Sequence, residues 1–133
     1  MKQTALKTLT CGNYISRPVS AKGIGMKLIA REALKQALDK NSVKLIFVQG
    51  DWQYRTVHIP GSINIHSEEE ALRMLKPSDN IVVYCVNDIC PISVSIYNFL
   101  VDHGYKNVRR YAGGLTDWNQ AGYPLEGEIT TLH

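Results

Sequence analysis

The sequence predicts an α/β fold, a three-layer arrangement in which a mostly parallel central sheet carries helices on both faces. Short, continuously apolar runs at 45–48 and 81–84 predict strands that are buried on both sides. Segments with helical spacing of apolar residues alternate with such runs along the chain, which is typical of parallel sheets. The turn residues Pro60-Gly61 and Gly113-Gly114 lie between these segments.

The chain has 133 residues, of which 44% are hydrophobic and 20% charged, so we expect one packed globular domain. Its formal charge is +3, and its Lys and Arg residues form no cluster with aromatic residues, so no nucleic acid partner is expected. No apolar run approaches the ~20 residues of a membrane span, so no membrane partner is expected. Residues 1–25 show no clear periodicity of apolar residues, so we predict an N-terminal extension there and the domain over 26–133.

The expected elements follow in order along the domain. Strands are predicted at 26–29, 43–48, 62–65, 81–84 and 108–111, and helices at 31–38, 54–57 and 115–120. Ser67 and Glu70 have the spacing of a capping box, which predicts a further helix that Pro77 terminates. Pro91 suits the first turn of another helix, because a missing N–H costs nothing there. That helix is expected to end at Gly104, a favoured residue after a helix C-terminus.

Cys85 directly follows the apolar run 81–84, at the position where a parallel strand would end. Ligands of such sheets bind at the carboxyl ends of the strands. Backbone N–H groups of the following loop and of the helix that begins at Pro91 would converge there on a thiolate. A cysteine in that setting has a pKa lowered from ~8.5 to roughly 3.5–7.5, which predicts a nucleophile at neutral pH. The alternative is a buried cysteine that acts as a small hydrophobic residue.

The three cysteines, Cys11, Cys85 and Cys90, form no even framework of disulfides, so the cytoplasm is the expected compartment. Cys85 and Cys90 have C-x4-C spacing, but no second Cys/His pair completes the four ligands of a zinc site. We therefore expect no metal, and nothing in the sequence indicates a cofactor. The glutamates at 68–70 lie in the first turn of a predicted helix, where acidic residues interact favourably with the helix dipole.

Four segments follow one another along the chain: HIPGSIN at 58–64, VVYC at 82–85, GYKNV at 104–108 and GGLTDW at 113–118. In this order they resemble the rhodanese-like sulfurtransferase family in its single-domain form. The segment HIPGSIN at 58–64 is similar to the family's H-I-P-G-A-x-N turn, and VVYC at 82–85 resembles the active-site strand that ends in the catalytic cysteine. The segments GYKNV at 104–108 and GGLTDW at 113–118 resemble the closing G-[FY]-x-x-V and G-G-x-x-x-W segments. Four segments at consistent spacing are specific, although each alone is weak. The resemblance extends over residues 27–126.

The resemblance implies a sulfurtransferase of the thiosulfate sulfurtransferase type that works through Cys85. In this family the cysteine thiolate takes the outer sulfur of thiosulfate or of a persulfide, holds it as a persulfide and passes it to a nucleophile. The implied partners are a small-molecule or protein persulfide donor and a thiol acceptor. The substrate-binding loop is implied to consist of Val86, Asn87, Asp88, Ile89 and Cys90. Its backbone N–H groups, with those of the helix that follows, would cradle the transferred sulfur.

Two departures from the family pattern bear on the donor. Many members carry Asp-x-Arg at the end of the strand before the H-I-P-G turn, and here Phe47 and Gln49 occupy these positions. Loops of members that use thiosulfate usually include a basic residue, whereas this loop has none and contains Asp88. Two charges ~6 Å apart at an effective dielectric near ~20 repel by a few kcal/mol per unit charge. We therefore predict that thiosulfate, a dianion, is a poor donor.

Cys90 stands five residues after Cys85, as a second cysteine does in some members of the family. It is a candidate resolving thiol that would attack the Cys85 persulfide and leave a disulfide. The alternatives are a second sulfur carrier and a residue that only begins the helix.

Two other classes of function are considered beside sulfur transfer. Phosphatases and arsenate reductases need Cys-x5-Arg so that the arginine clamps the oxyanion, and here the sixth residue after Cys85 is Pro91, which argues against that chemistry. The second class is a non-catalytic binding module of the same fold, or a sulfur-carrier or redox-sensing module. The presence of Cys85 favours the enzyme. The absence of the Asp-x-Arg pair means that the non-catalytic module stays an alternative.

Other polar and aromatic residues near these segments have structural interpretations. His58 is expected to stabilise its turn rather than act as a base, because a thiolate nucleophile needs none. Tyr84 and Trp118 are expected in the core. Arg109 and Arg110 are expected either to line the rim of the pocket or to face solvent.

Overall fold

In the computed structural model, which describes residues 26–87, 89 and 91–128, four strands form one sheet. The strands are β1 (Lys44–Phe47), β2 (Ser62–Asn64), β3 (Ile81–Tyr84) and β4 (Val108–Tyr111), and their order is β2-β1-β3-β4. Each neighbouring pair among them is parallel, with Leu45 opposite both Ser62 and Val82. The predicted parallel sheet is therefore confirmed.

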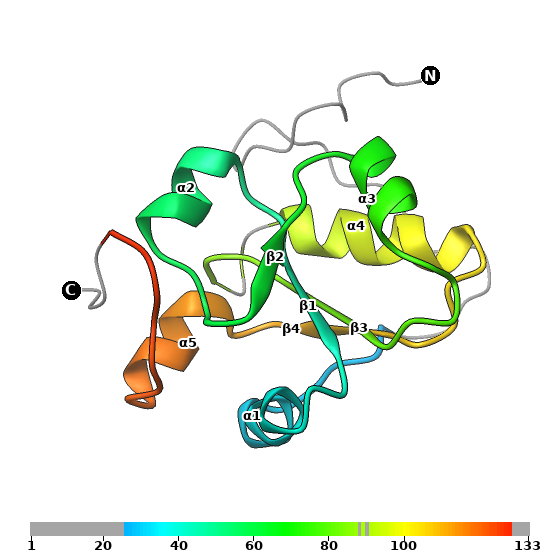
Figure 1. Cartoon of the computed structure of the whole chain (residues 1–133). Coiled ribbons are helices and arrows are strands. Elements are labelled where there is room, and N and C mark those ends of the chain that lie inside the picture. The colour runs from blue at the N-terminus through cyan, green and yellow to red at the C-terminus, as the bar shows by residue number, and fades with distance from the viewer. Residues whose placement is uncertain (1–25, 88, 90, 129–133) are drawn as a thin grey trace.

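Helices cover both faces of this sheet, as Figure 1 shows. They are α1 (Arg31–Asp39), α2 (Asp51–Thr56), α3 (Glu68–Met74), α4 (Pro91–Asp102) and α5 (Gly114–Gln120). The helices α3 and α4 lie on one face, and α1 and α5 lie on the other. Within the described ranges, none of the helices combines the length and the apolar character that crossing a membrane requires. The predicted three-layer arrangement is confirmed.

Two hydrophobic cores fill the space between the layers, and β3 contributes to both. Ile81 and Val83 belong to the core under α3 and α4, whereas Val82 and Tyr84 belong to the core under α1 and α5. All four residues are buried, because helices cover both faces of this central strand. Burying one such side chain contributes roughly 1.5–3 kcal/mol. The strand that leads to Cys85 is therefore held by packing on both sides.

The capping box predicted before α3 is present, with one change of partner. The Ser67 hydroxyl accepts a hydrogen bond from the Glu70 N–H at 3.1 Å. The Glu70 carboxylate accepts one from the His66 N–H at 3.0 Å, so it reaches the residue before the cap. The helix α4 ends at Asp102, and Gly104 follows with a φ of 89°, a conformation that suits glycine after a helix.

Two predicted elements differ from the structure. The segment 26–29 is not a strand, because it forms only an isolated parallel bridge, in which Leu28 is opposite Arg110. The helix α2 begins at Asp51, earlier than the single turn predicted at 54–57. An ion pair of 2.9 Å between Asp51 and Arg55 lies along its surface, and Asp51 at the first helical position also suits the helix dipole.

Candidate active site

Cys85 lies at the carboxyl end of β3, the strand that has β1 on one side and β4 on the other. Only 1% of its surface is exposed. The chain then leaves the sheet through Val86 and Asn87, which are half-buried, and through Ile89, which is 82% exposed. The helix α4 follows, so the predicted order of strand, cysteine, loop and helix is present.

The described part of the loop contains a local hydrogen bond that the sequence did not predict. The Ile89 N–H donates to Asn87 Oδ1 at 3.2 Å. This N–H is one of those expected to face the transferred sulfur, and the Asn87 side chain competes for it. Asp88 and Cys90 lie outside the described residues, so the roles predicted for them stay predictions.

Gln49 places a side-chain amide against the sulfur of Cys85. It follows β1, the strand next to β3, and is 3% exposed. Its Nε2 donates a hydrogen bond to Cys85 Sγ at 2.9 Å. Asn64, which ends β2, holds the backbone of Gln49, because its Nδ2 donates to Gln49 O at 2.8 Å. The ends of three neighbouring strands therefore build the surroundings of one sulfur atom.

The beginning of α5 holds the backbone at Cys85. The Leu115 N–H donates to Cys85 O at 3.1 Å, and the Thr116 N–H donates to Val86 O at 2.9 Å. Gly114 has a φ of 63°, and a Cβ atom at this position would lie 2.3 Å from Cys85 O. Glycine is required here because any side chain would collide with the backbone that carries the cysteine. The G-G segment noted in the sequence thus positions the end of β3.

Arg110 is a buried cation whose charge acts on the cysteine. It lies on β4, next to β3, and is 7% exposed. Its Nε donates to the Ser93 hydroxyl, in the first turn of α4, at 2.8 Å. The alternative that it faces solvent is therefore wrong, because the side chain is buried and a hydroxyl inside the domain binds the guanidinium. The neighbouring Arg109 is half-exposed.

Burial raises the pKa of the Cys85 thiol above its ordinary value, because the charged form loses its hydration in the interior. Three groups act in the opposite direction and lower this pKa: the Gln49 side chain, the Val86 backbone N–H and the charge of Arg110. The net direction is upward. The prediction of a lowered pKa is therefore wrong for the described surroundings of the sulfur, since desolvation outweighs two hydrogen bonds and one cation.

Tyr84 connects the active-site strand to the H-I-P-G turn. Its hydroxyl accepts a hydrogen bond from the Ile59 N–H at 3.0 Å and donates one to Ser62 Oγ at 2.9 Å. Burial raises the pKa of Tyr84, so the hydroxyl remains a donor. Its ring stacks on Phe47 with 4.9 Å between centroids. The predicted core positions of Tyr84 and Trp118 are confirmed by exposed fractions of 0% and 1%.

His58 has the contacts of a structural histidine. One ring nitrogen lies 2.6 Å from Tyr54 O, and the other lies 3.1 Å from Glu126 Oε1. The ring stacks on Tyr54 with 3.8 Å between centroids. These contacts attach the turn to α2 and to the segment after α5, as expected for a residue that stabilises the turn. Across the described parts of the chain, no group of three or more His, Cys, Asp or Glu side chains is arranged to hold a metal ion.

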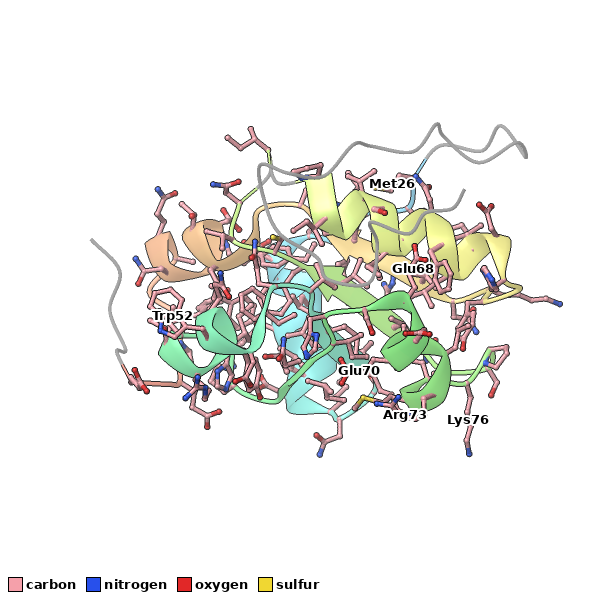
Figure 2. All side chains as sticks on the ribbon, turned by 90° about the horizontal axis from the view of Figure 1, so that it is seen from above. Met26, Trp52, Glu68, Glu70, Arg73 and Lys76 are labelled. Atoms are coloured by element: carbon pink, nitrogen blue, oxygen red, sulfur yellow. The ribbon has the colours of Figure 1, made fainter. Side chains whose placement is uncertain are left out.

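Two large apolar side chains are exposed on segments that leave the carboxyl edge of the sheet. Trp52, on α2, is 67% exposed, and Ile89, in the loop after Cys85, is 82% exposed. Figure 2 shows Trp52 at the outer edge of the molecule. The segments that follow β1 and β3 therefore each present an apolar side chain to solvent.

Comparison with protein families and relatives agrees with this geometry. The family model described as the Rhodanese-like domain matches residues 30–121. A protein named HTH-type transcriptional regulator Rv0324, from Mycobacterium tuberculosis, is 32% identical over 100 residues. The match covers 74% of this chain and 44% of that relative, so the chain spans less than half of the relative's length.

Solved structures show the same fold. The Rhodanese-like domain of the Anabaena sp. Alr3790 protein is 26% identical, with a TM-score of 0.68, over 79% of this chain and 82% of that one. The BH2092 protein of Bacillus halodurans is 20% identical, with a TM-score of 0.71, over 78% and 79% of the two chains. The human single-domain sulfurtransferase TSTD1 is 22% identical, with a TM-score of 0.64, over 72% of this chain and 97% of that one. Because the family model matches residues 30–121 of 133, the chain belongs to the rhodanese-like domain family.

Proposed function

We propose that this protein is a sulfurtransferase that moves a sulfane sulfur from a donor to a thiol or another nucleophile through a persulfide on Cys85. One observation carries the proposal. The Cys85 sulfur is buried at the carboxyl end of β3 and accepts a hydrogen bond from Gln49 Nε2 at 2.9 Å. A fixed N–H donor in a dry site stabilises negative charge on sulfur as the reaction develops it. Membership of the rhodanese-like family supports the same chemistry.

The reaction is a pair of sulfur transfers that need no external oxidant or reductant. In the first, the Cys85 thiolate attacks the outer sulfur of the donor, and the donor leaves as sulfite if it was thiosulfate or as a thiolate if it was a persulfide. In the second, an acceptor thiolate attacks the outer sulfur of the Cys85 persulfide. The bond between the two sulfur atoms breaks, and Cys85 leaves as a thiolate.

We propose a persulfide, rather than thiosulfate, as the preferred donor. The loop sequence contains Asp88 and no Lys or Arg, which disfavours a dianion at the entrance. Arg110, whose charge acts on the Cys85 thiol, is buried and donates to the Ser93 hydroxyl, so it does not face solvent. The exposed Trp52 and Ile89 suit contact with an organic or protein-bound persulfide. We also propose that transfer takes place in the cytoplasm, where thiol acceptors are reduced.

Steady-state turnover tests the function and the choice of donor together. Wild-type protein is assayed with a thiol acceptor and, in turn, with a small-molecule persulfide, 3-mercaptopyruvate and thiosulfate. The matched variants are Cys85→Ser and Cys11→Ser. We expect turnover with the persulfide, much weaker turnover with thiosulfate, full activity in Cys11→Ser and none in Cys85→Ser. An active Cys85→Ser variant would refute the assignment of the nucleophile, and thiosulfate turnover equal to that with the persulfide would refute the donor preference.

A second candidate is a sulfur-carrier or redox-sensing module. The relative that is 32% identical carries the name of a transcriptional regulator, which favours a regulatory module. Such a module would accept sulfur on Cys85 but would turn over slowly. The predicted resolving role of Cys90 belongs to this candidate, because a Cys85–Cys90 disulfide would switch the site off until a reductant reopened it.

A further inference from the structure

Gln49 and Cys85 are two buried polar groups that approach each other from neighbouring strand ends. They are 36 residues apart in sequence, and Gln49 Nε2 lies 2.9 Å from Cys85 Sγ. The exposed fractions of the two residues are 3% and 1%. The backbone of Gln49 is fixed by Asn64, whose Nδ2 donates to its carbonyl oxygen at 2.8 Å. The hydrogen bond from an N–H group held in this way to a sulfur in a dry site is strongest when the sulfur is negatively charged.

We propose that Gln49 is a catalytic residue that stabilises negative charge on Cys85 Sγ, and that it acts mainly when sulfur leaves the enzyme. This proposal rests on the sulfurtransferase function proposed above. Gln49 occupies the position at which many family members carry arginine. The side chain that donates a hydrogen bond to the sulfur is therefore uncharged in this protein. A neutral amide stabilises the thiolate without adding a charge that would attract anionic donors.

The two half-reactions place charge differently on Sγ. Before the donor reacts, Sγ is a thiolate and carries the charge. In the persulfide, the charge lies on the outer sulfur, and Sγ is neutral. When the acceptor thiolate attacks the outer sulfur, the bonding electron pair returns to Sγ, which becomes a thiolate again. The hydrogen bond from Gln49 therefore strengthens during discharge and weakens during loading.

This difference predicts opposite effects of Gln49 on the two steps. A thiolate of lower pKa is a better leaving group, so Gln49 accelerates discharge. The same stabilisation makes the thiolate a weaker nucleophile, with a Brønsted coefficient of about 0.4–0.5, so Gln49 slows attack on the donor once the thiol is fully ionised. At any pH below the thiol pKa, neutral pH included, Gln49 also increases the fraction of thiolate, and there it favours loading as well.

The first test measures the thiolate without sulfur transfer. Cys85 is made the single thiol by Cys11→Ser and Cys90→Ser, and its alkylation rate by iodoacetamide is measured against pH. Gln49→Met removes the donor at similar volume, Gln49→Glu adds a carboxylate, and Gln36→Met on the exposed side of α1 is the control. We expect Gln49→Met to raise the Cys85 pKa by about one to two units. Gln49→Glu should raise it further, and the control should match the parent.

The second test separates the half-reactions by single-turnover kinetics above the thiol pKa of each variant. In Gln49→Met, loading from a small-molecule persulfide should be about twofold to tenfold faster. Discharge to a thiol should be about threefold to tenfold slower. An unchanged pKa, or an equal slowing of both steps with altered thermal unfolding, would overturn the proposal, since either result indicates a structural residue. If the parent protein forms no persulfide with any donor, the sulfurtransferase function fails, and the alkylation profile alone decides whether Gln49 stabilises the thiolate.

Discussion

The ionisation of the Cys85 thiol depends on two opposing influences, the burial of the thiol and the charge of the buried Arg110 guanidinium. Burial raises the thiol pKa, whereas the cation lowers it. The net shift of the Cys85 pKa is upward. The rate of any reaction of the thiolate should therefore rise with pH through the neutral range and level off above the thiol pKa.

Replacing Arg110 tests the contribution of the cation. We expect Arg110→Met to raise the Cys85 pKa by less than about one unit, because the Arg110 charge lowers this pKa less than the Gln49 and Val86 hydrogen bonds do. The alkylation rate below the pKa should fall accordingly, and by less than in Gln49→Met. Arg109→Met is the control, because Arg109 is half-exposed on the same strand. An equal effect of the two arginine variants would show that the general charge of β4, rather than the buried guanidinium, acts on the thiol.

At the scale of elements, the contact between α5 and β3 fixes the cysteine backbone. The N–H groups of Leu115 and Thr116 donate to the carbonyl oxygens of Cys85 and Val86 at 3.1 Å and 2.9 Å. The approach is possible because Gly114 has no side chain. The helix therefore contributes two backbone N–H groups to the site.

A pair of glycine variants tests this role of α5. Gly114→Ala places a Cβ atom 2.3 Å from Cys85 O, so the end of β3 must move. We expect a loss of more than about 2 kcal/mol in the free energy of unfolding and a lower turnover number in the protein that remains folded. Gly104→Ala is the control, because Gly104 also has a positive φ, 89°, but a Cβ atom there meets nothing within 4 Å.

Gly104→Ala should therefore cost only about 1–2 kcal/mol for the backbone conformation and leave turnover unchanged. Chemical denaturation measures both stabilities, and turnover is compared at equal folded fractions. If the two variants lose stability equally and keep full activity, the contact between α5 and Cys85 does not position the nucleophile.

At the scale of the whole molecule, the fold was predictable because its signals are local. The continuous apolar run at 81–84 reports burial on both faces, which requires helices on both sides of a parallel sheet. The Ser67 cap of α3 is a hydrogen bond to a residue three positions away, and Pro91 suits the start of α4 because the first turn leaves its N–H groups unpaired. The placement of Cys85 at a strand end follows from the same local order of strand, loop and helix.

The electrostatic surroundings of Cys85 were not predictable in the same way. Gln49 reaches the sulfur only because β1 and β3 pair in one particular register. Arg110 is buried because Ser93, on the helix above the sheet, binds its guanidinium. Both contacts depend on tertiary structure, and no periodicity in the sequence reports them. The upward shift of the thiol pKa likewise follows from the degree of burial, which a strand pattern alone does not give.

The central claim is that Cys85 carries the transferred sulfur, and its most direct test is the mass of the protein after one exposure to a small-molecule persulfide. We predict that wild type and Cys11→Ser each gain the mass of one sulfur atom, which peptide mapping assigns to Cys85, and that a thiol acceptor removes it. Cys85→Ser should gain none, with an unchanged far-ultraviolet circular dichroism spectrum as evidence that it is folded. A wild-type protein that gains no sulfur, or one that carries it on Cys11 or Cys90 while Cys85 remains a free thiol, would contradict the account.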